Sequence, residues 1–272
     1  MAKPHIPDSI EKGNVDDPLT ICGFGCLGGT ISCASPYVGK VETFCRMNDI
    51  PYEVLSPGDK KSKKAPKSPK STLPYIIHGS TVLSDSTFIL DYLTNTFPEK
   101  ITTKSSSDPF LRGMAVAAQR LCENHLYWGV VYYRWVDPDG ASQLRPLFFK
   151  SVPFPLKGIA SGVVGRGIQD TMRRQGFGRH SKKDVYKLLD DSLSALSDII
   201  GENKFLTGGT PCPEDASVFG VLDNYLNQGL ENDSLKELAS KYPNLSVYVE
   251  NMREAYFPGD NPSKFQENTM FK

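Results

Sequence analysis

Ser35 and Pro36 stand directly in front of a segment whose apolar residues recur at helical spacing. Serine is a favoured N-cap residue and proline a favoured first helical residue, so the pair predicts that a helix begins at Pro36. The unpaired N–H groups and the dipole at such a helix end favour an anion, and they lower the pKa of a thiol bound there. The Ser35 hydroxyl could also donate a hydrogen bond to a thiolate. A second interpretation, in which Ser-Pro is only a helix cap, stays open because such caps are common.

Two further pairs, Leu73-Pro74 and Asp85-Ser86, have residue types that suit peptide recognition. Pro74 cannot donate to a central strand ladder, so it indicates a sheet edge or a cis bond, and a cis bond would expose the Leu73 backbone to an extended peptide. Ser86, near a helix start, could hold a carboxylate, and Asp85 could hold an ammonium group. Ordinary capping is the alternative for both. Together the three pairs predict a thiol site, a backbone-pairing site and a site for an amino-acid zwitterion.

The elements that must position these pairs alternate between strand and helix over residues 18–98. The patterns predict strands at 19–24, 50–55, 73–77 and 81–83, and helices at 36–47 and 84–97. The order β-α-β followed by β-β-α predicts an α/β domain with one parallel crossover and one antiparallel hairpin. Residues 56–72 contain six lysines among Pro and Ser, which indicates a solvated loop. Residues 1–17 are polar and predict a flexible N-terminal arm.

No strand pattern follows residue 98, so the remainder is predicted to be all-helical. A polar linker at 101–108 leads into a helical domain over 108–258, and 259–272 form a polar tail. We expect one long helix over 110–135, and its apolar stripe is formed by Met114, Leu121, Trp128 and Trp135.

Several boundaries inside the helical domain can be predicted from single residues. Ser181, followed by Asp184, predicts the start of a helix that Gly201 ends. Asn244 is the expected cap of the last helix. The Gly- and Arg-rich segment 162–180 is interpreted as a helix–helix connection, because it lacks the strand-Gly-helix order of a phosphate site.

Composition excludes several function classes. The chain has 272 residues, 39% of them hydrophobic, and a formal net charge of zero, which favours neither nucleic acid nor an anionic membrane. No apolar run of about 18 residues is present, so no membrane-spanning helix is expected. The six cysteines form neither CxxC pairs nor zinc spacings with histidine, which predicts reduced thiols, a cytoplasmic protein and no metal site.

Six stretches of the chain resemble the glutathione S-transferase superfamily, and within it the failed-axon-connections family, a branch related to metaxins. The stretches cover most of residues 19–258 and read SPYVGKVETFCRMNDIPYE, LPYIIHGSTVLSDSTFILDYL, ENHLYWGVVYYRW, GFGRHSKKDV, FLTGGTPCPEDASVFGVLDNYL and YPNLSVYVENMREAYFP. The resemblance implies the glutathione transferase architecture, in which an α/β thioredoxin-like N-terminal domain precedes an all-α C-terminal domain. It also implies glutathione as the cofactor.

The resemblance implies roles for individual residues. Ser35 would face the glutathione sulfur, and Cys33 is a rival reactive thiol two positions earlier. One loop lysine, such as Lys70, would meet the glycine carboxylate. Leu73-Pro74 would pair with the cysteinyl backbone, and Asp85-Ser86 would hold the γ-glutamyl group. The residues expected around glutathione are therefore Pro36, Tyr37, Leu73, Pro74, Asp85 and Ser86.

In transferases the long helix borders the electrophile pocket, so the resemblance implies His125, Trp128 and Tyr132 as substrate-binding residues. A lone histidine on an apolar stripe is more often a hydrogen-bonded core residue, and this alternative stays open for His125. The function implied is activation of the glutathione thiol for attack on a small apolar electrophile, in a chain that could form a homodimer. Two alternatives remain: a non-catalytic metaxin-like binding or scaffold protein, and a glutathione-dependent lyase, isomerase or thiol reductase using Cys33.

Overall fold

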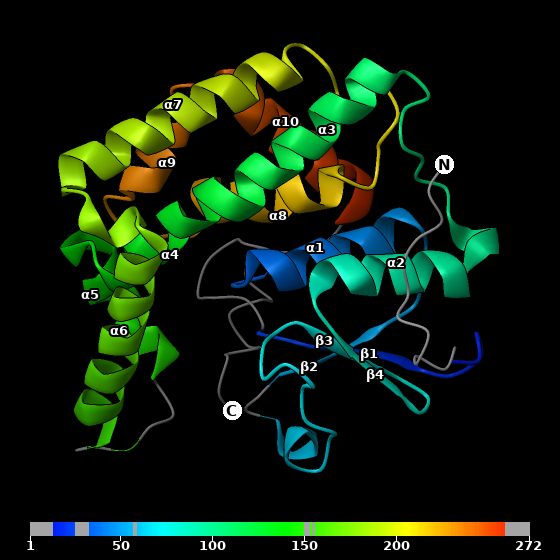
Figure 1. The fold of residues 1–272 in the computed structure, drawn as a ribbon, viewed down its shortest axis with the longest axis horizontal. Coiled ribbons are helices and arrows are strands. Elements are labelled where there is room, and N and C mark those ends of the chain that lie inside the picture. Colours follow the sequence, from blue (N-terminus) through cyan, green and yellow to red (C-terminus); the bar gives the residue numbers. More distant parts are fainter. Residues whose placement is uncertain (1–12, 25–32, 57–58, 150–152, 154–155, 259–272) are drawn as a thin grey trace.

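The computed structural model describes residues 13–24, 33–56, 59–149, 153 and 156–258, which form a sheet domain followed by a helical domain (Figure 1). Most of the predicted N-terminal arm and the whole predicted tail lie outside these residues. The described part of the arm, residues 13–17, lies against the sheet domain, since the Gly13 N–H donates to the Tyr92 hydroxyl at 2.8 Å.

The sheet domain has the elements that the sequence predicts, in the predicted order. Its strands and helices are β1 (Leu19–Cys22), α1 (Pro36–Met47), β2 (Glu53–Leu55), β3 (Tyr75–His78), β4 (Thr81–Ser84) and α2 (Ser86–Thr96). The strand order is β2-β1-β3-β4, with β2 parallel to β1 and both β3 and β4 in antiparallel pairs. Helices α1 and α2 lie between the sheet and the helical domain (Figure 1). This is a thioredoxin-like arrangement, and it confirms the predicted fold class.

Burial on one face of the sheet explains why these short strands hold together. Ile21 of β1 and Ile76 of β3 are fully buried in the same core as Val38 and Val41 of α1. Burying one such side chain contributes about 1.5–3 kcal/mol. The lysine-rich segment between β2 and β3 contains one 3-10 turn, Lys60–Lys63, and all six of its lysines are exposed.

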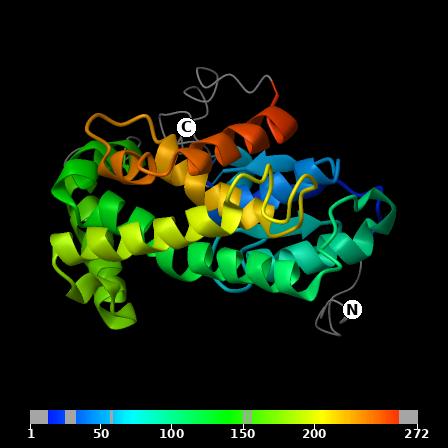
Figure 2. The same cartoon turned by 90° about the horizontal axis from the view of Figure 1, so that it is seen from above.

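The helical domain is arranged around α8, every residue of which is buried. Its helices are α3 (Pro109–Leu121), α4 (Tyr127–Trp135), α5 (Pro138–Phe148), α6 (Leu156–Gln175), α7 (Lys182–Ile200), α8 (Asp215–Leu226), α9 (Ser234–Ala239) and α10 (Pro243–Tyr256). Helices α3 and α10 lie on opposite sides of α8 (Figure 2). Helix α8 also packs on α1, and a Cβ atom at Gly220 would come within 2.7 Å of the Pro36 carbonyl oxygen. Only glycine permits this close approach, which joins the two domains.

The predicted long helix over 110–135 is interrupted by a π-helical turn, Cys122–Leu126, between α3 and α4. A π turn holds extra residues, so it rotates everything after it relative to a regular helix. Of the predicted stripe, Trp135 is buried, whereas Met114, Leu121 and Trp128 are only half-buried. The buried face instead follows Ala118, Cys122, Leu126, Val130 and Tyr133.

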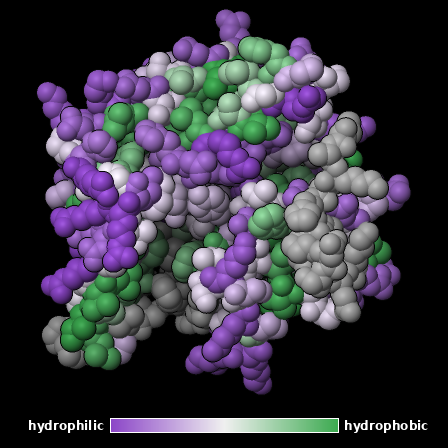
Figure 3. All heavy atoms as spheres, viewed as in Figure 1, coloured by the Kyte–Doolittle hydropathy of each residue, from purple (hydrophilic) through white to green (hydrophobic). Residues whose placement is uncertain are grey.

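The segment 162–180 is also not the connection that we predict from its glycines, because α6 runs through it as far as Gln175. The connection is confined to the residues after α6, where Gly176 has a φ of 112°. Helix α6 leaves Leu156, Ile159 and Val163 more than half exposed, and this apolar surface occupies the lower left of Figure 3. Repeated glycines lower helix propensity, and packing of the helix's other face overrides it here.

Two of the three predicted helix boundaries are confirmed. The Ser181 side chain accepts from the Asp184 N–H at 3.2 Å at the start of α7, and Gly201 ends that helix with a φ of 55°. Asn244 is not the cap of α10, because that position belongs to Tyr242. The Asn244 amide instead donates to the Gly201 carbonyl at 3.0 Å and so ties α10 to α7.

Other sequence expectations concern cysteines, membranes and metals. The five cysteines in the described ranges are buried and form no disulfide with one another. Across the part of the chain that the structure describes, no helix has the length and apolar character needed to cross a bilayer. The same residues contain no group of three or more His, Cys, Asp or Glu side chains suited to a metal ion.

Candidate functional site

The register of the sheet brings the three predicted pairs to one edge. Cys22, the last residue of β1, pairs with Tyr75, and Tyr75 pairs with Ser84. The loop after β1 leads to Ser35, Leu73-Pro74 directly precedes β3, and Asp85-Ser86 directly follows β4. The short pairs that the sequence places far apart therefore meet at the edge where α1 and α2 begin.

Ser35 caps α1 with an extended backbone, and its Oγ accepts from the Val38 N–H at 3.4 Å. Accepting this bond leaves the hydroxyl proton available for donation. Pro36 is the first residue of α1, as predicted. The N–H groups of the first turn and the Ser35 hydroxyl thus form a site where a thiolate would be stabilised.

The Leu73–Pro74 bond is cis, as predicted, and Leu73 lies outside the β3 ladder. A hollow of about 270 Å³ lies beside it, and Lys67, Ser68 and Tyr75 contribute to its walls. Lys70, the lysine named as an example from the sequence, contacts Asp85 instead, at 3.4 Å. Lys67 is therefore the lysine better placed to meet a carboxylate beside Leu73.

Asp85 caps α2 and holds a backbone conformation that non-glycine residues rarely adopt, with a φ of 84°. Its Oδ1 accepts from the Thr87 N–H at 3.1 Å, which leaves oxygen lone pairs for another donor. Ser86 is the buried first residue of the helix. Strained backbone of this kind clusters at ligand sites, so the conformation supports a binding role for Asp85.

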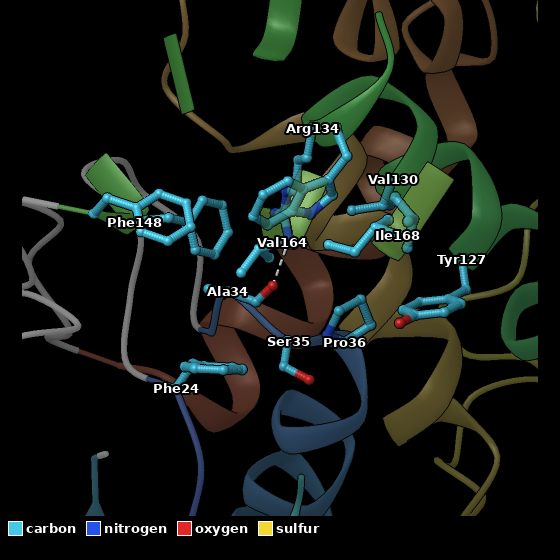
Figure 4. A pocket seen from close by; sticks show the side chains of 13 residues that line it. Phe24, Ala34, Ser35, Pro36, Tyr127, Val130, Arg134, Phe148, Val164 and Ile168 are labelled. Atoms are coloured by element: carbon cyan, nitrogen blue, oxygen red, sulfur yellow. Dashed lines mark hydrogen bonds between the residues drawn. The ribbon is translucent and has the colours of Figure 1, made fainter. Parts of the chain in front are cut away.

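An apolar cavity of about 380 Å³ adjoins Ser35 and Pro36 (Figure 4). Its other wall comes from α4, α5, the residue after α5, and α6. The lining side chains from that wall are Tyr127, Val130, Val131, Arg134, Trp135, Phe148, Phe149, Val164 and Ile168. Phe24, at the end of the described part of the β1 loop, closes the opposite side. The cavity can thus hold a small apolar molecule next to the Ser35 hydroxyl.

Among the described residues that line this cavity, Arg134 is the only charged one, and it is 5% exposed. Its guanidinium donates to the carbonyl oxygen of Ala34, which immediately precedes Ser35 (Figure 4). It also donates to the side-chain oxygens of Gln228 and Asn224. The Asn224 amide in turn donates to the Cys33 carbonyl at 3.1 Å. The helical domain therefore fixes the backbone on which Ser35 stands.

A buried ion pair joins the two domains behind the cavity. Lys40 of α1 contacts Glu123 of the π turn at 2.7 Å, and both side chains are less than 10% exposed. Glu123 also accepts from Gln119, Arg120 and Ser217. Burial would raise the pKa of the Glu123 carboxyl, but Lys40 and these donors hold it below its ordinary value.

Comparison with known proteins gives a consistent assignment. Residues 36–140 match the profile described as the glutathione S-transferase N-terminal domain, and residues 189–252 match that of the glutathione S-transferase C-terminal domain. The isoprene-epoxide–glutathione S-transferase of Rhodococcus sp. (strain AD45) is 30% identical over 88% of this chain and 99% of its own length. The chain belongs to the glutathione S-transferase superfamily.

Other relatives of this transferase-family chain are more distant. Failed axon connections of Drosophila melanogaster is 26% identical over 82% of the chain, which spans about half of that protein (54%). Human Metaxin-2 is 25% identical over 80% of each chain. Among solved structures, the β-etherase LigF of Sphingobium sp. strain SYK-6 covers 88% of this chain and matches 98% of its own, with a TM-score of 0.58 and 17% identity. This last likeness supports the glutathione transferase architecture predicted from the sequence.

Not all residues that the family resemblance implies lie at the cavity. Trp128 and Tyr132 do not line it, and neither does His125, whose Nδ1 lies 2.9 Å from the Ser192 hydroxyl. His125 packs edge-on against Phe177, and burial lowers its pKa. It thus has the surroundings of a core histidine. The π turn explains the difference, because it rotates Tyr127 and Arg134 to the cavity side of α4.

Tyr37 and Cys33 also face away from the position expected for glutathione. The Tyr37 hydroxyl donates to the Glu123 carbonyl at 2.8 Å, so its side chain joins the domains. Cys33 is 1% exposed, and its thiol donates to the Phe24 carbonyl at 2.8 Å. Because its sulfur is enclosed, the structure does not support Cys33 as a reactive thiol, and Ser35 remains the candidate catalytic residue.

Several residues that complete the cavity carry little signal in the sequence. Arg134 lies within an aromatic run, Phe148 and Phe149 lie at the end of a helix that contains Pro146, and Val164 and Ile168 lie in a glycine-rich segment. One usable signal was the spacing of Tyr127, Val131, Arg134 and Trp135, which share one face of a helix that starts at Tyr127.

Proposed function

We propose that this protein is an active glutathione S-transferase that ionises the glutathione thiol at Ser35 and delivers it to a small apolar electrophile. One observation carries the proposal: Ser35 caps α1 and also lines the apolar cavity. A thiolate held by this hydroxyl would be adjacent to any molecule that fills the cavity. Once both substrates are bound, bringing them into contact would therefore cost little further translational or rotational entropy.

The remaining parts of glutathione have candidate partners along the same sheet edge. Asp85 would hold the γ-glutamyl ammonium group, Leu73 would pair with the cysteinyl backbone, and Lys67 would attract the glycine carboxylate. The Rhodococcus relative is named for an epoxide, which is a small electrophile that suits an apolar cavity of about 380 Å³. We further propose that the protein works in the cytoplasm, where its buried thiols would stay reduced.

Thiol activation would come from the Ser35 hydroxyl and the α1 N-terminus. Both interact with the thiolate more strongly than with the neutral thiol, so the glutathione pKa falls on binding. A combined stabilisation of about 2 kcal/mol would lower that pKa by about 1.5. The released proton passes to solvent, and the thiolate attacks the electrophilic carbon.

The test is the pH dependence of kcat/KM for glutathione conjugation with a small electrophile. We expect Ser35→Ala to raise the apparent pKa of the profile by more than one unit and to lower the rate below neutral pH. Ser35→Thr keeps a hydroxyl and should retain most of the shift. An unchanged profile in Ser35→Ala would remove Ser35 from the mechanism.

Glutathione binding is tested separately with Asp85→Asn. This change keeps the oxygen that caps Thr87 but removes the charge, so we expect glutathione to bind about tenfold more weakly. The matched control is Lys70→Met, which removes the 3.4 Å surface contact and leaves the carboxylate in place. If the wild-type protein binds no glutathione at millimolar concentration, the enzymatic proposal fails and a binding or scaffold function on this fold remains.

A further inference from the structure

Arg134 is a buried cation whose three hydrogen-bond acceptors among the described residues are all neutral. Its Nε donates to Gln228 Oε1 at 2.8 Å, and its two terminal nitrogens donate to Asn224 Oδ1 and the Ala34 carbonyl. Within the described residues, no carboxylate forms an ion pair with it. Burial lowers the pKa of Arg134 to about 10, so the group stays charged at neutral pH.

No carboxylate in the described residues hydrogen-bonds Arg134, although Asp233 attracts it through space. Asp233 Oδ1 accepts from the N–H groups of Leu235 and Lys236, and its buried Oδ2 has no hydrogen-bond partner among the described residues. Tyr127 and Cys33 also interact electrostatically with the guanidinium, and burial raises the pKa of the Tyr127 hydroxyl. A buried charge without a hydrogen-bonded anion is costly, so Arg134 would gain from an anionic group that arrives in the cavity with the substrate.

Gln228 gives a second indication that the charge of Arg134 is available to a ligand. Its Oε1 accepts from Arg134, whereas its Nε2 is buried and has no hydrogen-bond partner among the described residues. Replacing that NH₂ group with an oxygen would give glutamate, which would satisfy the same Arg134 bond and neutralise the cation. The chain instead has a residue that leaves the charge available to the cavity.

The guanidinium also has donors to spare. It carries five N–H groups, and the three bonds above leave two without a partner in the described chain. Ser35 and Arg134 both line the cavity, and the guanidinium lies next to the residue that precedes Ser35. A molecule in the cavity would therefore be near both the thiolate proposed at Ser35 and a cation that can stabilise developing negative charge.

We propose that Arg134 is a catalytic residue that receives the oxygen released from the electrophile, and that the site therefore favours small apolar epoxides over electrophiles that lose a halide. This inference rests on the proposed glutathione transferase function. The thiolate sulfur attacks an epoxide carbon, a C–S bond forms, and the C–O bond breaks with its electron pair moving to oxygen. Arg134 hydrogen-bonds that oxygen, which then takes a proton from water and becomes a hydroxyl group.

A structural role for Arg134, holding Ala34 in place, predicts a different result from the same variants. Arg134→Met removes both the charge and the Ala34 contact, so a general loss of activity in that variant decides nothing by itself. Gln228→Glu separates the two roles, because it keeps the Arg134 contacts and cancels the charge. A structural Arg134 would be better held in Gln228→Glu and would lose no activity.

The experiment compares kcat/KM of the wild-type protein and both variants for 1,2-epoxybutane and for 1-chloro-2,4-dinitrobenzene, with glutathione saturating. We expect Gln228→Glu to lower the epoxide rate at least tenfold, to change the aryl chloride rate less than about threefold, and to keep or raise the Tm. We expect Arg134→Met to lower the epoxide rate more than the aryl chloride rate.

Each other outcome is decisive. If Gln228→Glu leaves the ratio of the two rates unchanged, or if the wild-type protein conjugates only the aryl chloride, the role of Arg134 is overturned and the transferase function stands. If the wild-type protein conjugates neither compound, the transferase function fails and the inference fails with it.

Discussion

Two regions form the candidate site: the sheet edge, which carries Ser35 and Asp85, and the helical wall of the cavity, which carries Arg134. Their residues are held in place in different ways. At the edge, each side chain is fixed within its own turn: Ser35 accepts from Val38 N–H, and Asp85 accepts from Thr87 N–H. On the wall, residues are fixed by partners far along the chain, as when Arg134 holds the Ala34 carbonyl. A cap that depends only on its own helix turn is little affected by substitutions elsewhere in the chain. A contact between distant segments is lost when either segment changes. The glutathione site that we propose at the edge could therefore be kept while the electrophile accepted at the wall changes.

This separation depends on the buried Lys40–Glu123 ion pair, which joins the two regions. Lys40 belongs to α1, the helix that Ser35 caps, and Glu123 belongs to the π turn that orients the cavity face of α4. Their buried contact at 2.7 Å sets the position of the wall relative to the edge.

The largest predicted effect follows from breaking this joint with Glu123→Ala. The change leaves Lys40 buried without its carboxylate and removes the acceptor used by Ser217, so we expect a loss of about 3–5 kcal/mol in the free energy of unfolding. Urea denaturation measures the loss. Adding Lys40→Met should recover part of it, because the orphaned charge is then gone.

The same variant predicts how the contribution of Glu123 to the free energy of unfolding depends on pH. The pKa of Glu123 is lower in the folded protein than its ordinary value of 4.5, so its contribution is complete above that value and is lost as the pH falls through the lower, folded pKa. The difference between wild type and Glu123→Ala should therefore shrink in acid. Asp191→Asn, which breaks the exposed Lys187–Asp191 contact, is the control and should leave the urea midpoint unchanged. A deficit that does not depend on pH would mean that the carboxylate charge is not the cause.

How each region is held also decides how much of it the sequence predicts. The edge follows from short-range chemistry: Ser-Pro predicts a helix start, and Leu73-Pro74 and Asp85-Ser86 each stand where a predicted strand or helix begins. These features need only a few neighbouring residues to be recognised. The parallel pair and the antiparallel hairpin were predicted for this reason, and the cis bond at Leu73–Pro74 is one of the two alternatives that the proline indicated.

The wall depends on features that a local pattern does not contain. Long-range partners surround the π turn at Cys122–Leu126: Ser217 donates to Glu123 and the Tyr225 hydroxyl donates to the Leu126 carbonyl. The family resemblance implies Trp128 at the pocket, whereas Tyr127 lines it in the structure. The glycines in α6 predict a loop, because the sequence does not show which helices pack against that segment. Arg134 can be recognised as a site residue only from its contact with Ala34, which is 100 residues away in the sequence.

A smaller effect is expected from narrowing the cavity with Val164→Phe, which tests whether the wall alone selects the electrophile. Val164 lines the cavity and is 41% exposed, so a ring can enter without displacing the core. We expect kcat/KM for a bulky electrophile to fall about tenfold, with glutathione affinity unchanged. Val163→Phe is the matched control, since Val163 is 63% exposed and points away from the cavity. Weaker glutathione binding in Val164→Phe would show that wall and edge are coupled.

The smallest effect compares two serine caps of similar geometry, one at the edge and one remote from it. Ser181 accepts from the Asp184 N–H at 3.2 Å, and Ser35 accepts from the Val38 N–H at 3.4 Å. Ser181→Ala should cost about 1 kcal/mol in the free energy of unfolding and leave conjugation unchanged. Ser35→Ala should cost no more stability than that, because its capping bond is longer, and yet it should lose activity. Equal activity in the two variants, measured beside equal thermal shifts, would mean that the Ser-Pro pair at α1 is a helix cap only, which is the alternative that the sequence leaves open.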